Sequence, residues 1–378
     1  MNTEATPRDR SALRILELGD NMTFALGKPG QTDFYMASMR GNRSKSAGPW
    51  PEMTLARIWK LFARVRRGDY DLVVVQPPIY PWWHLRSFLT VVKNTLLRGR
   101  VLGFFATWSA TLAFPLLRFL PRTVPMVVVD MNDSFGIFRH NVFLFGRCHT
   151  YFKRELPIDK WHVFYRSGHR NLPTANFRAK PRWRRRIDKI APLGVGTVQP
   201  ALDRALASFG SDKKTDLFFA GTTFATNRVR EEGVALLDAL KARGVVVDHV
   251  TETLPFGDFI DRCAQAWLTW SPAGFGWECF RHLEASLAGS VPVISSPTIH
   301  RYRPMNHCEH CFFYHVEGED LVETVIEALQ DKDKLARMAE AARDHVLQHH
   351  THEALCDHVI DVALGDGVTP KADVETVQ

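Results

Sequence analysis

The sequence lacks the features that mark secreted and membrane-spanning proteins. Its six cysteines are scattered without a regular framework, which indicates a reducing compartment. Residues 1–18 begin polar and hold no apolar run before a small-residue cleavage site, so we do not interpret them as a signal peptide. The longest apolar region, Val101–Leu120, is interrupted by polar residues and Pro115, and we expect it to be buried or interfacial. The sequence therefore predicts a cytoplasmic protein.

Acidic residues are fewer than basic ones, and internal repeats of solenoid period are absent. The chain carries 41 Asp and Glu against 48 Lys and Arg, a net charge of +7. This balance favours anionic partners: nucleic acid, phosphorylated small molecules or an acidic membrane face. A length of 378 residues is enough for two domains of ordinary size.

Continuous apolar runs alternate with helical patterns along the first half. The runs at 13–18, 70–78 and 125–134 each end in polar, glycine or proline residues, as buried strands of a parallel sheet do. Residues 54–67 have apolar side chains at helical spacing with Arg or Lys between them, which predicts a basic amphipathic helix. This alternation predicts an α/β layer with a mostly parallel sheet.

The second half repeats the alternation more clearly. Strands are expected at 216–220, 245–250, 267–270 and 291–295, helices at 227–243 and 256–266, and two final helices at 332–350 and 351–364. We expect a first domain at 1–205, a second at 206–365 and a flexible tail at 366–378.

The segment Ser271–Ser295, SPAGFGWECFRHLEASLAGSVPVIS, combines a glycine-rich loop with a short charged helix. We expect the helix at Trp277–Leu287, where Phe280, Leu283 and Leu287 predict a buried stripe, and Gly289 is the expected residue just past the helix end. The loop glycines let backbone amides approach a ligand, and helix N-termini favour anions. An ordinary surface helix with a solvated pair of opposite charges explains the same spacing.

Residues 274–295, GFGWECFRHLEASLAGSVPVIS, resemble a segment of glycosyltransferases of the GT-B fold, especially bacterial family 1-type and exostosin-like members. Residues 216–230, DLFFAGTTFATNRVR, are similar to the entry into the nucleotide-binding domain of these families, and 151–156, YFKREL, to another of their segments. The resemblance implies two Rossmann-like domains facing a cleft, with C-terminal helices packing back toward the first domain. The first domain would bind the acceptor and the second a nucleotide-sugar.

The resemblance also implies residue roles in donor binding. Glu284 would hold the nucleotide ribose, and Arg281, with Arg228 or Arg230, would neutralise the donor diphosphate. Fixed guanidinium groups stabilise the negative charge of the leaving group without a metal or cofactor, and we expect neither. The other expected donor-binding residues are Gly221, Gly274, Phe275, Gly276, Trp277 and Glu278. Many retaining members carry a glutamate eight positions before the second one; Gly276 stands there, so the stereochemistry is not predicted.

An inverting enzyme needs a general base from the first domain. Asp130 and Asp133, just past a buried strand, are the best-placed candidates, and Asp20 is a lesser one. A helix cap or Asx-turn explains the same aspartates. The charged run Lys153–Glu155 could reach the cleft or form an internally paired surface turn.

Two further patterns are weaker signals. His307–Cys311, HCEHC, has the Cys-x₂-Cys spacing of zinc sites but no second ligand pair, and a loop explains it as well. The basic segment 166–189 and the helix at 54–67, with Trp59, Trp82 and Trp83, could serve an anionic membrane surface, a phosphorylated acceptor or nucleic acid, or be a solvated basic face.

Taken together, the residues and the resemblance predict a transferase that moves a sugar from a nucleotide-sugar donor to a hydroxyl of a glycan or glycolipid. Cell-envelope polysaccharide or glycolipid synthesis, at the inner face of a membrane, is the expected setting, with no nucleic-acid partner. Two rivals stay open. One is a nucleic-acid-binding protein that uses 166–189, and the other is a catalytically inactive nucleotide-sugar-binding module.

Overall fold

The computed structural model describes most of the chain. The described residues are 10–19, 21–36, 51, 53–78, 112–164, 166–169, 172–174, 185–221, 228–316 and 320–365, with the side chains of 166–169, 172–174 and 228 left out. Asp20, Trp82 and Trp83, residues 101–111, half of the basic segment 166–189 and the tail 366–378 lie outside this description. In the part of the chain that is described, no helix is both long and apolar enough to cross a membrane.

A six-stranded parallel sheet forms the first half, in the order β2-β1-β3-β4-β5-β8. Its strands are β1 (Ile15–Gly19), β2 (Thr32–Met36), β3 (Leu72–Val75), β4 (Met126–Asp130), β5 (Tyr151–Lys153) and β8 (Ile190–Pro192). The strands expected at 13–18, 70–78 and 125–134 form as β1, β3 and β4. Along β3, Val73 and Val75 pack into one hydrophobic cluster, whereas Leu72 and Val74 pack into another on the opposite face. Burial of both faces explains the continuous apolar runs.

Helix α2 (Leu55–Arg67) covers one face of this sheet, and its ends follow from sequence. Thr54 caps the helix by accepting the Arg57 N–H, and Gly68 ends it in the left-handed conformation with φ of 81°. The short elements around the sheet are α1 (Phe24–Gly27), the 3₁₀ turns Arg10–Ala12, Phe114–Phe119, Arg139–Gly146, Lys160–Phe164 and Ile187–Lys189, and the antiparallel pair β6 (Arg166–His169) and β7 (Leu172–Thr174).

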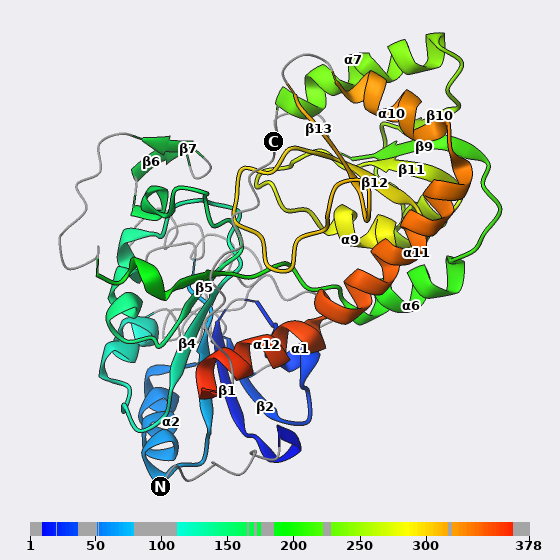
Figure 1. The fold of residues 1–378 in the computed structure, drawn as a ribbon. Coiled ribbons are helices and arrows are strands. Elements are labelled where there is room, and N and C mark those ends of the chain that lie inside the picture. The colour runs from blue at the N-terminus through cyan, green and yellow to red at the C-terminus, as the bar shows by residue number, and fades with distance from the viewer. Residues whose placement is uncertain are drawn as a thin grey trace, which may run out of the picture.

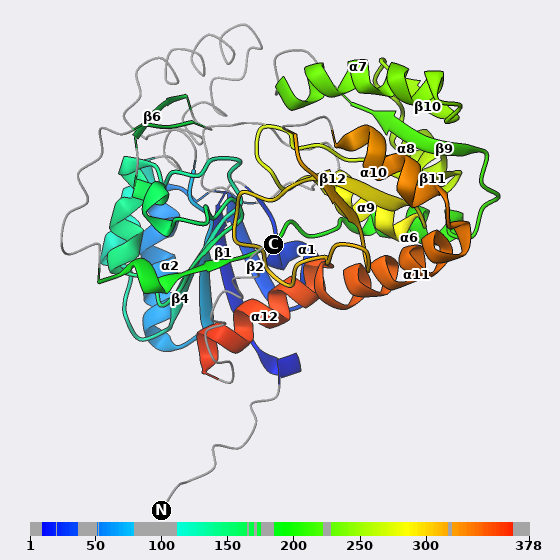
Figure 2. The same cartoon turned by 45° about the horizontal axis from the view of Figure 1, so that its top comes forward.

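A five-stranded parallel sheet forms the second half, in the order β10-β9-β11-β12-β13. Its strands are β9 (Thr215–Ala220), β10 (Val247–Val250), β11 (Ala266–Trp270), β12 (Val291–Ser295) and β13 (Phe312–Tyr314). Helices pack on both faces, as Figures 1 and 2 show. They are α6 (Gln199–Ser208), α7 (Arg228–Ala242), α8 (Phe256–Ala264), α9 (Phe280–Leu287), α10 (Leu321–Leu329) and α11 (Lys332–His349). The resulting α/β architecture of two parallel sheets confirms the predicted fold class.

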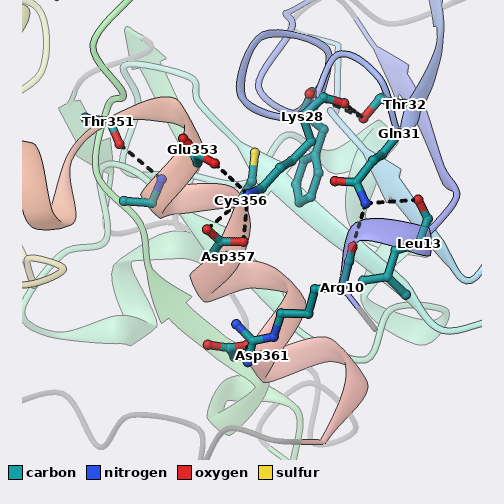
Figure 3. A network of polar contacts seen from close by, with 12 residues as sticks. Arg10, Leu13, Lys28, Gln31, Thr32, Thr351, Glu353, Cys356, Asp357 and Asp361 are labelled. Atoms are coloured by element: carbon teal, nitrogen blue, oxygen red, sulfur yellow. Dashed lines mark hydrogen bonds and ion pairs between the residues drawn. The ribbon is translucent and has the colours of Figure 1, made fainter. Parts of the chain in front are cut away.

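The last helix, α12 (His352–Leu364), returns to the first sheet. It continues from the end of α11 and lies against α1 and β4 (Figures 1 and 2). Lys28 forms ion pairs with Glu353 and Asp357 of α12, and Arg10 pairs with Asp361 (Figure 3). The first lobe therefore consists of the first sheet, its helices and α12, and the second lobe consists of the second sheet with α6–α11.

Candidate functional site

Helix α9 and the loop before it occupy the C-terminal edge of β11 and β12. The helix begins at Phe280, with Cys279 at the N-cap, and not at Trp277. Leu283 and Leu287 are buried as predicted, but Phe280 is 46% exposed, so the predicted apolar stripe holds only two of its three members. Gly289 follows the helix end with φ of 86°, which confirms its expected place.

Arg281 is buried inside this edge and not on a solvated helix face. Its side chain donates from Nη2 to the Ala220 carbonyl at 2.8 Å, at the end of β9, and lies over the Phe219 ring at 5.3 Å. The Nε and Nη1 atoms are buried and have no hydrogen-bond partner. A Cβ at Gly221 would come within 2.5 Å of Nη2, which explains why a glycine stands there. A buried guanidinium with unpaired N–H groups is costly unless an anion meets it.

Arg230, from the first turn of α7, brings a second buried guanidinium to the same edge. Its Nε donates to the Ala273 carbonyl at 3.0 Å, and a Cβ at Gly274 would lie 2.9 Å from its Nη2. Burial first, and then the positive charge of Arg281, lower the pKa of Arg230. Two cations that repel each other in a buried position fit a divalent or polyvalent anion between them.

Glu284 lies one turn after Arg281 on α9 and is half-buried. Burial raises the pKa of its carboxyl to about 7, against the opposing effect of Arg281. This carboxyl can accept hydrogen bonds from hydroxyl groups when it is ionised. The structure thus brings Arg281, Arg230, Gly221 and Gly274 together, with Glu284 on the same helix as Arg281.

Trp277 and His282 fix the loop to the sheet. The Trp277 indole N–H donates to the Ser295 carbonyl at 2.8 Å, at the end of β12. His282, which the sequence analysis missed, is 2% exposed and bonds Ser271 Oγ at 2.7 Å and the Trp277 carbonyl at 3.1 Å. Burial lowers the pKa of His282 to about 3, so the ring is neutral, and its two hydrogen bonds hold the loop in place. The apolar spacing of the helix does not predict the role of His282, because its polar partners are the Trp277 carbonyl in the loop and the Ser271 side chain.

Residues of the first lobe contact this loop directly. Glu155, which follows β5, accepts the backbone N–H of Trp277 at 2.9 Å and that of Glu278 at 3.0 Å. Arg154 donates to the Glu278 carbonyl at 2.5 Å and is ion-paired with Asp133. Lys153 and Glu155 are fully buried, so the segment is not the surface turn that the sequence also allowed. It lies at the contact between the lobes.

Asp130 and Asp133 differ in their surroundings. Asp130 is 2% exposed; its Oδ2 accepts the Tyr151 hydroxyl at 2.8 Å and lies 3.3 Å from Lys153 Nζ, and its Oδ1 accepts from Asn132. These contacts fit a structural anchor. The Asp133 side chain is 36% exposed and paired with Arg154. Asp133 is therefore the more accessible aspartate of the two.

Three of the expected donor-binding residues, Phe275, Gly276 and Glu278, have surroundings that differ from those of Arg281 and Arg230. Phe275 is 41% exposed at the tip of the loop. Gly276 lies against Glu155, whose Oε1 would be 2.3 Å from a Cβ there. The Glu278 carboxyl accepts the Val195 N–H at 3.0 Å, and burial raises its pKa to about 8 against the effect of Arg154. Arg228 begins α7, and its side chain lies outside the described part.

The sequence His307–Cys311 forms a tight turn. His307 Nδ1 accepts the Phe313 N–H at 2.9 Å, and His310 Nδ1 accepts the Asn306 N–H at 3.1 Å, so each ring is used in the turn. Cys308 has φ of 63° and is exposed, whereas Cys311 is buried. Among the described residues, no three His, Cys, Asp or Glu side chains are grouped to hold a metal ion.

No protein-family model and no curated protein match the chain. Solved structures do match its fold. An alpha-glucosyltransferase in complex with UDP-glucose and DNA containing an abasic site is 11% identical, with a TM-score of 0.51 over 93% of this chain and 99% of that one. A glycosyltransferase from Rickettsia africae ESF-5 is 10% identical, with a TM-score of 0.50 over 94% and 99%. With its two parallel sheets and returning C-terminal helix, the chain has the GT-B fold of the glycosyltransferases.

Proposed function

We propose that the protein is a glycosyltransferase that takes its sugar from a nucleotide-sugar donor. The paired buried guanidinium groups of Arg281 and Arg230 carry this proposal. Two guanidinium nitrogens of Arg281, Nε and Nη1, have no hydrogen-bond partner, and Gly221 leaves room beside the guanidinium, so the group suits phosphate oxygens. The alpha-glucosyltransferase with the same fold was solved in complex with UDP-glucose, which supports a nucleoside diphosphate as the anion.

The proposed reaction follows from these groups. The acceptor hydroxyl oxygen attacks the anomeric carbon, the bond from that carbon to the diphosphate oxygen breaks, and its electron pair stays on the diphosphate. Arg281 and Arg230 stabilise the charge that grows there. Glu284 holds the ribose hydroxyls, and in an inverting reaction Asp133 takes the acceptor proton. The first lobe supplies the acceptor side and the second lobe the donor side.

A screen for nucleoside diphosphates tests this function. UDP, GDP, ADP and CDP are added separately to the protein, and the melting temperature is measured. We expect one of them to raise the melting temperature, since ligand binding to the folded state stabilises it. The matching nucleotide-sugar should then release its diphosphate when acceptors are added. Binding without release in any acceptor extract favours the inactive module, and a chain that none of the four diphosphates stabilises contradicts the proposal.

For the acceptor, we propose a glycan or glycolipid hydroxyl at an anionic membrane surface. Helix α2 supports this setting. It has no acidic residue, and Ile58 and Phe62 are buried in the first lobe while Leu55 and Trp59 are exposed at 39% and 59%. Arg57, Lys60, Arg66 and Arg67 are exposed on the same helix. Exposed cations on a helix that also exposes a tryptophan suit a layer of acidic headgroups.

Vesicle sedimentation separates this setting from a soluble or nucleic-acid acceptor. We expect binding to vesicles with phosphatidylglycerol, weaker binding to neutral vesicles, and a further loss in Trp59→Ser. Because one solved structure of this fold contains DNA, duplex DNA is a second arm of the test. Salt-sensitive DNA binding with no vesicle binding would overturn the membrane setting and favour the nucleic-acid rival.

A further inference from the structure

A fully buried carboxylate of one lobe holds the backbone of the other. Glu155 is 0% exposed and belongs to the first lobe, two residues past the end of β5. Its Oε2 accepts the Trp277 N–H and its Oε1 accepts the Glu278 N–H, both in the loop that leads into α9. Hydrogen bonds from two backbone amides to one buried carboxylate are charge-assisted and strongly directional. This contact therefore fixes the loop in one conformation.

The contact between Glu155 and the loop is connected to Arg230 through hydrogen bonds within the loop. Immediately before Trp277, the Gly274 N–H donates to the Gly276 carbonyl at 2.9 Å and closes a tight turn. The Ala273 carbonyl, at the other end of this turn, accepts from Arg230 Nε. The position of the Arg230 guanidinium thus depends on the loop that Glu155 holds.

Gly276 shows how closely Glu155 fits. A Cβ at 276 would lie 2.3 Å from Glu155 Oε1 and 2.5 Å from its Cδ. Position 276 is eight before Glu284, where the resemblance to retaining glycosyltransferases places a first glutamate. In this chain a glutamate side chain from the other lobe fills the space that a side chain at 276 would need.

We propose that Glu155 is a positioning residue of the donor site, which sets the loop of residues 273–278 from the first lobe and makes donor affinity depend on contact between the lobes. The claim about donor affinity, the donor arm of the proposal, rests on the proposed function. The claim that Glu155 sets the loop, its structural arm, does not. Arg154 supports it, because its contacts with Glu278 and Asp133 join the same loop to the end of β4.

Hydrogen exchange in the full-length protein tests the structural arm without any ligand. In Glu155→Gln one carboxylate oxygen becomes an NH₂ group that meets a backbone N–H donor. We expect amide exchange in peptides covering 273–279 to rise about 10-fold or more, as loss of a buried charged hydrogen bond predicts. Unchanged exchange in this segment would overturn the proposal.

Glu17→Gln is the matched control. Glu17 is also a fully buried first-lobe carboxylate, and it accepts the backbone N–H groups of Thr23, Phe24 and Ala25, away from the donor loop. We expect Glu17→Gln to lower the melting temperature as Glu155→Gln does, with exchange at 273–279 unchanged. If both variants raise exchange there equally, Glu155 acts only through global stability and the proposal is wrong.

A double-mutant cycle tests the donor arm and guards against a variant that does not fold. The affinity for the nucleoside diphosphate that stabilises the wild type in the screen is measured by calorimetry in the wild type, Gly276→Ala, Glu155→Ala and the double variant. We expect Gly276→Ala to weaken binding about 10-fold in the wild type and less than about 3-fold in Glu155→Ala, because the space is then free. Equal effects in both backgrounds, or unchanged affinity for this diphosphate in Glu155→Ala, would overturn the donor arm. A wild type that binds none of UDP, GDP, ADP and CDP contradicts the proposed function instead, and the exchange experiment still decides the role of Glu155.

Discussion

The guanidinium groups of Arg230 and Arg281 lie close enough for the charge of Arg281 to lower the pKa of Arg230, after the larger effect of burial. Arg230 donates to the Ala273 carbonyl, and Arg281 donates to the Ala220 carbonyl. Ala273 lies in the loop that follows β11, and Ala220 is the last residue of β9. Two neighbouring strand ends of a parallel sheet therefore present two buried cations at one place, as sites for phosphorylated ligands in open α/β sheets do.

Pyrophosphate should stabilise the protein through this pair of cations, whatever the nucleotide base. We expect inorganic pyrophosphate to raise the melting temperature more than sodium chloride of equal ionic strength, because a bound anion relieves the repulsion between the two guanidinium groups. In Arg281→Met this difference should be lost. Differential scanning fluorimetry checks it, and an equal rise in both proteins would indicate that pyrophosphate binds elsewhere.

Gly221→Ala should weaken UDP binding with little effect on folding. The new Cβ would lie 2.5 Å from Arg281 Nη2 and push the guanidinium away from its anchor. We expect affinity to fall about 10-fold or more, since a charge-assisted hydrogen bond contributes about 1.5–3 kcal/mol. Gly30→Ala is the control, because nothing lies within 4 Å of a Cβ at Gly30. Calorimetry with UDP compares the two, and equal affinities would show that Gly221 does not shape the site.

Gly27→Ala should destabilise the contact between α1 and α12. A Cβ there would lie 2.5 Å from the His352 carbonyl oxygen and 2.7 Å from Cys356 Sγ, both on α12 (Cys356 in Figure 3). Backbone atoms cannot yield as a flexible side chain does, so we expect a loss of about 1–3 kcal/mol in the free energy of unfolding. Urea denaturation measures this loss. Stability equal to that of Gly30→Ala would contradict the packing of α12 on the first lobe.

The contribution of Glu278 to the free energy of unfolding should fall as the pH rises from 5 to 8. Burial raises the pKa of this carboxyl to about 8, beside Arg154 and Glu155. Over this range the folded chain therefore keeps a proton that the unfolded chain has lost, so stability is present at low pH and is lost as the pH rises. Buried His282, with its pKa lowered to about 3, acts in the opposite direction up to the ordinary histidine pKa.

The difference between wild type and Glu278→Gln isolates this effect. Because the amide does not titrate, the melting temperature of Glu278→Gln should fall less, or rise more, than that of the wild type between pH 5 and pH 8. Parallel pH profiles for the two proteins would contradict the raised pKa of Glu278.

The sequence predicted the sheets well because each strand is a continuous apolar run, and β1, β3, β4, β9, β11 and β12 form where these runs lie. The predicted helix end at Gly289 also holds, since a left-handed residue there is a local property. The loop of Trp277 was harder to predict. Its helix begins three residues later than expected, because Glu155 and Arg154 hold the backbone of Trp277 and Glu278 from a distant part of the chain.

Contacts over long sequence separations also decide which charged residues belong to the site. Spacing alone allowed Arg281 and Glu284 to form a solvated pair, whereas Arg281 is 8% exposed and bonds to the end of β9, 61 residues away. Spacing likewise ranked Asp130 with Asp133, and only the packing of Tyr151 and Lys153 around Asp130 separates them. Such partners come from other strands, and periodicity along one segment carries no information about them.

Calorimetric titration of UDP into the wild type, Arg281→Met and Arg337→Met tests the central claim most directly. Arg337 is an exposed arginine of α11 and serves as the matched control. We expect Arg337→Met to bind UDP as the wild type does and Arg281→Met to bind it about 10–100-fold more weakly, as the loss of a buried charge-assisted contact predicts. Equal UDP affinity in Arg281→Met and the wild type would contradict the assignment of this buried arginine to a donor diphosphate.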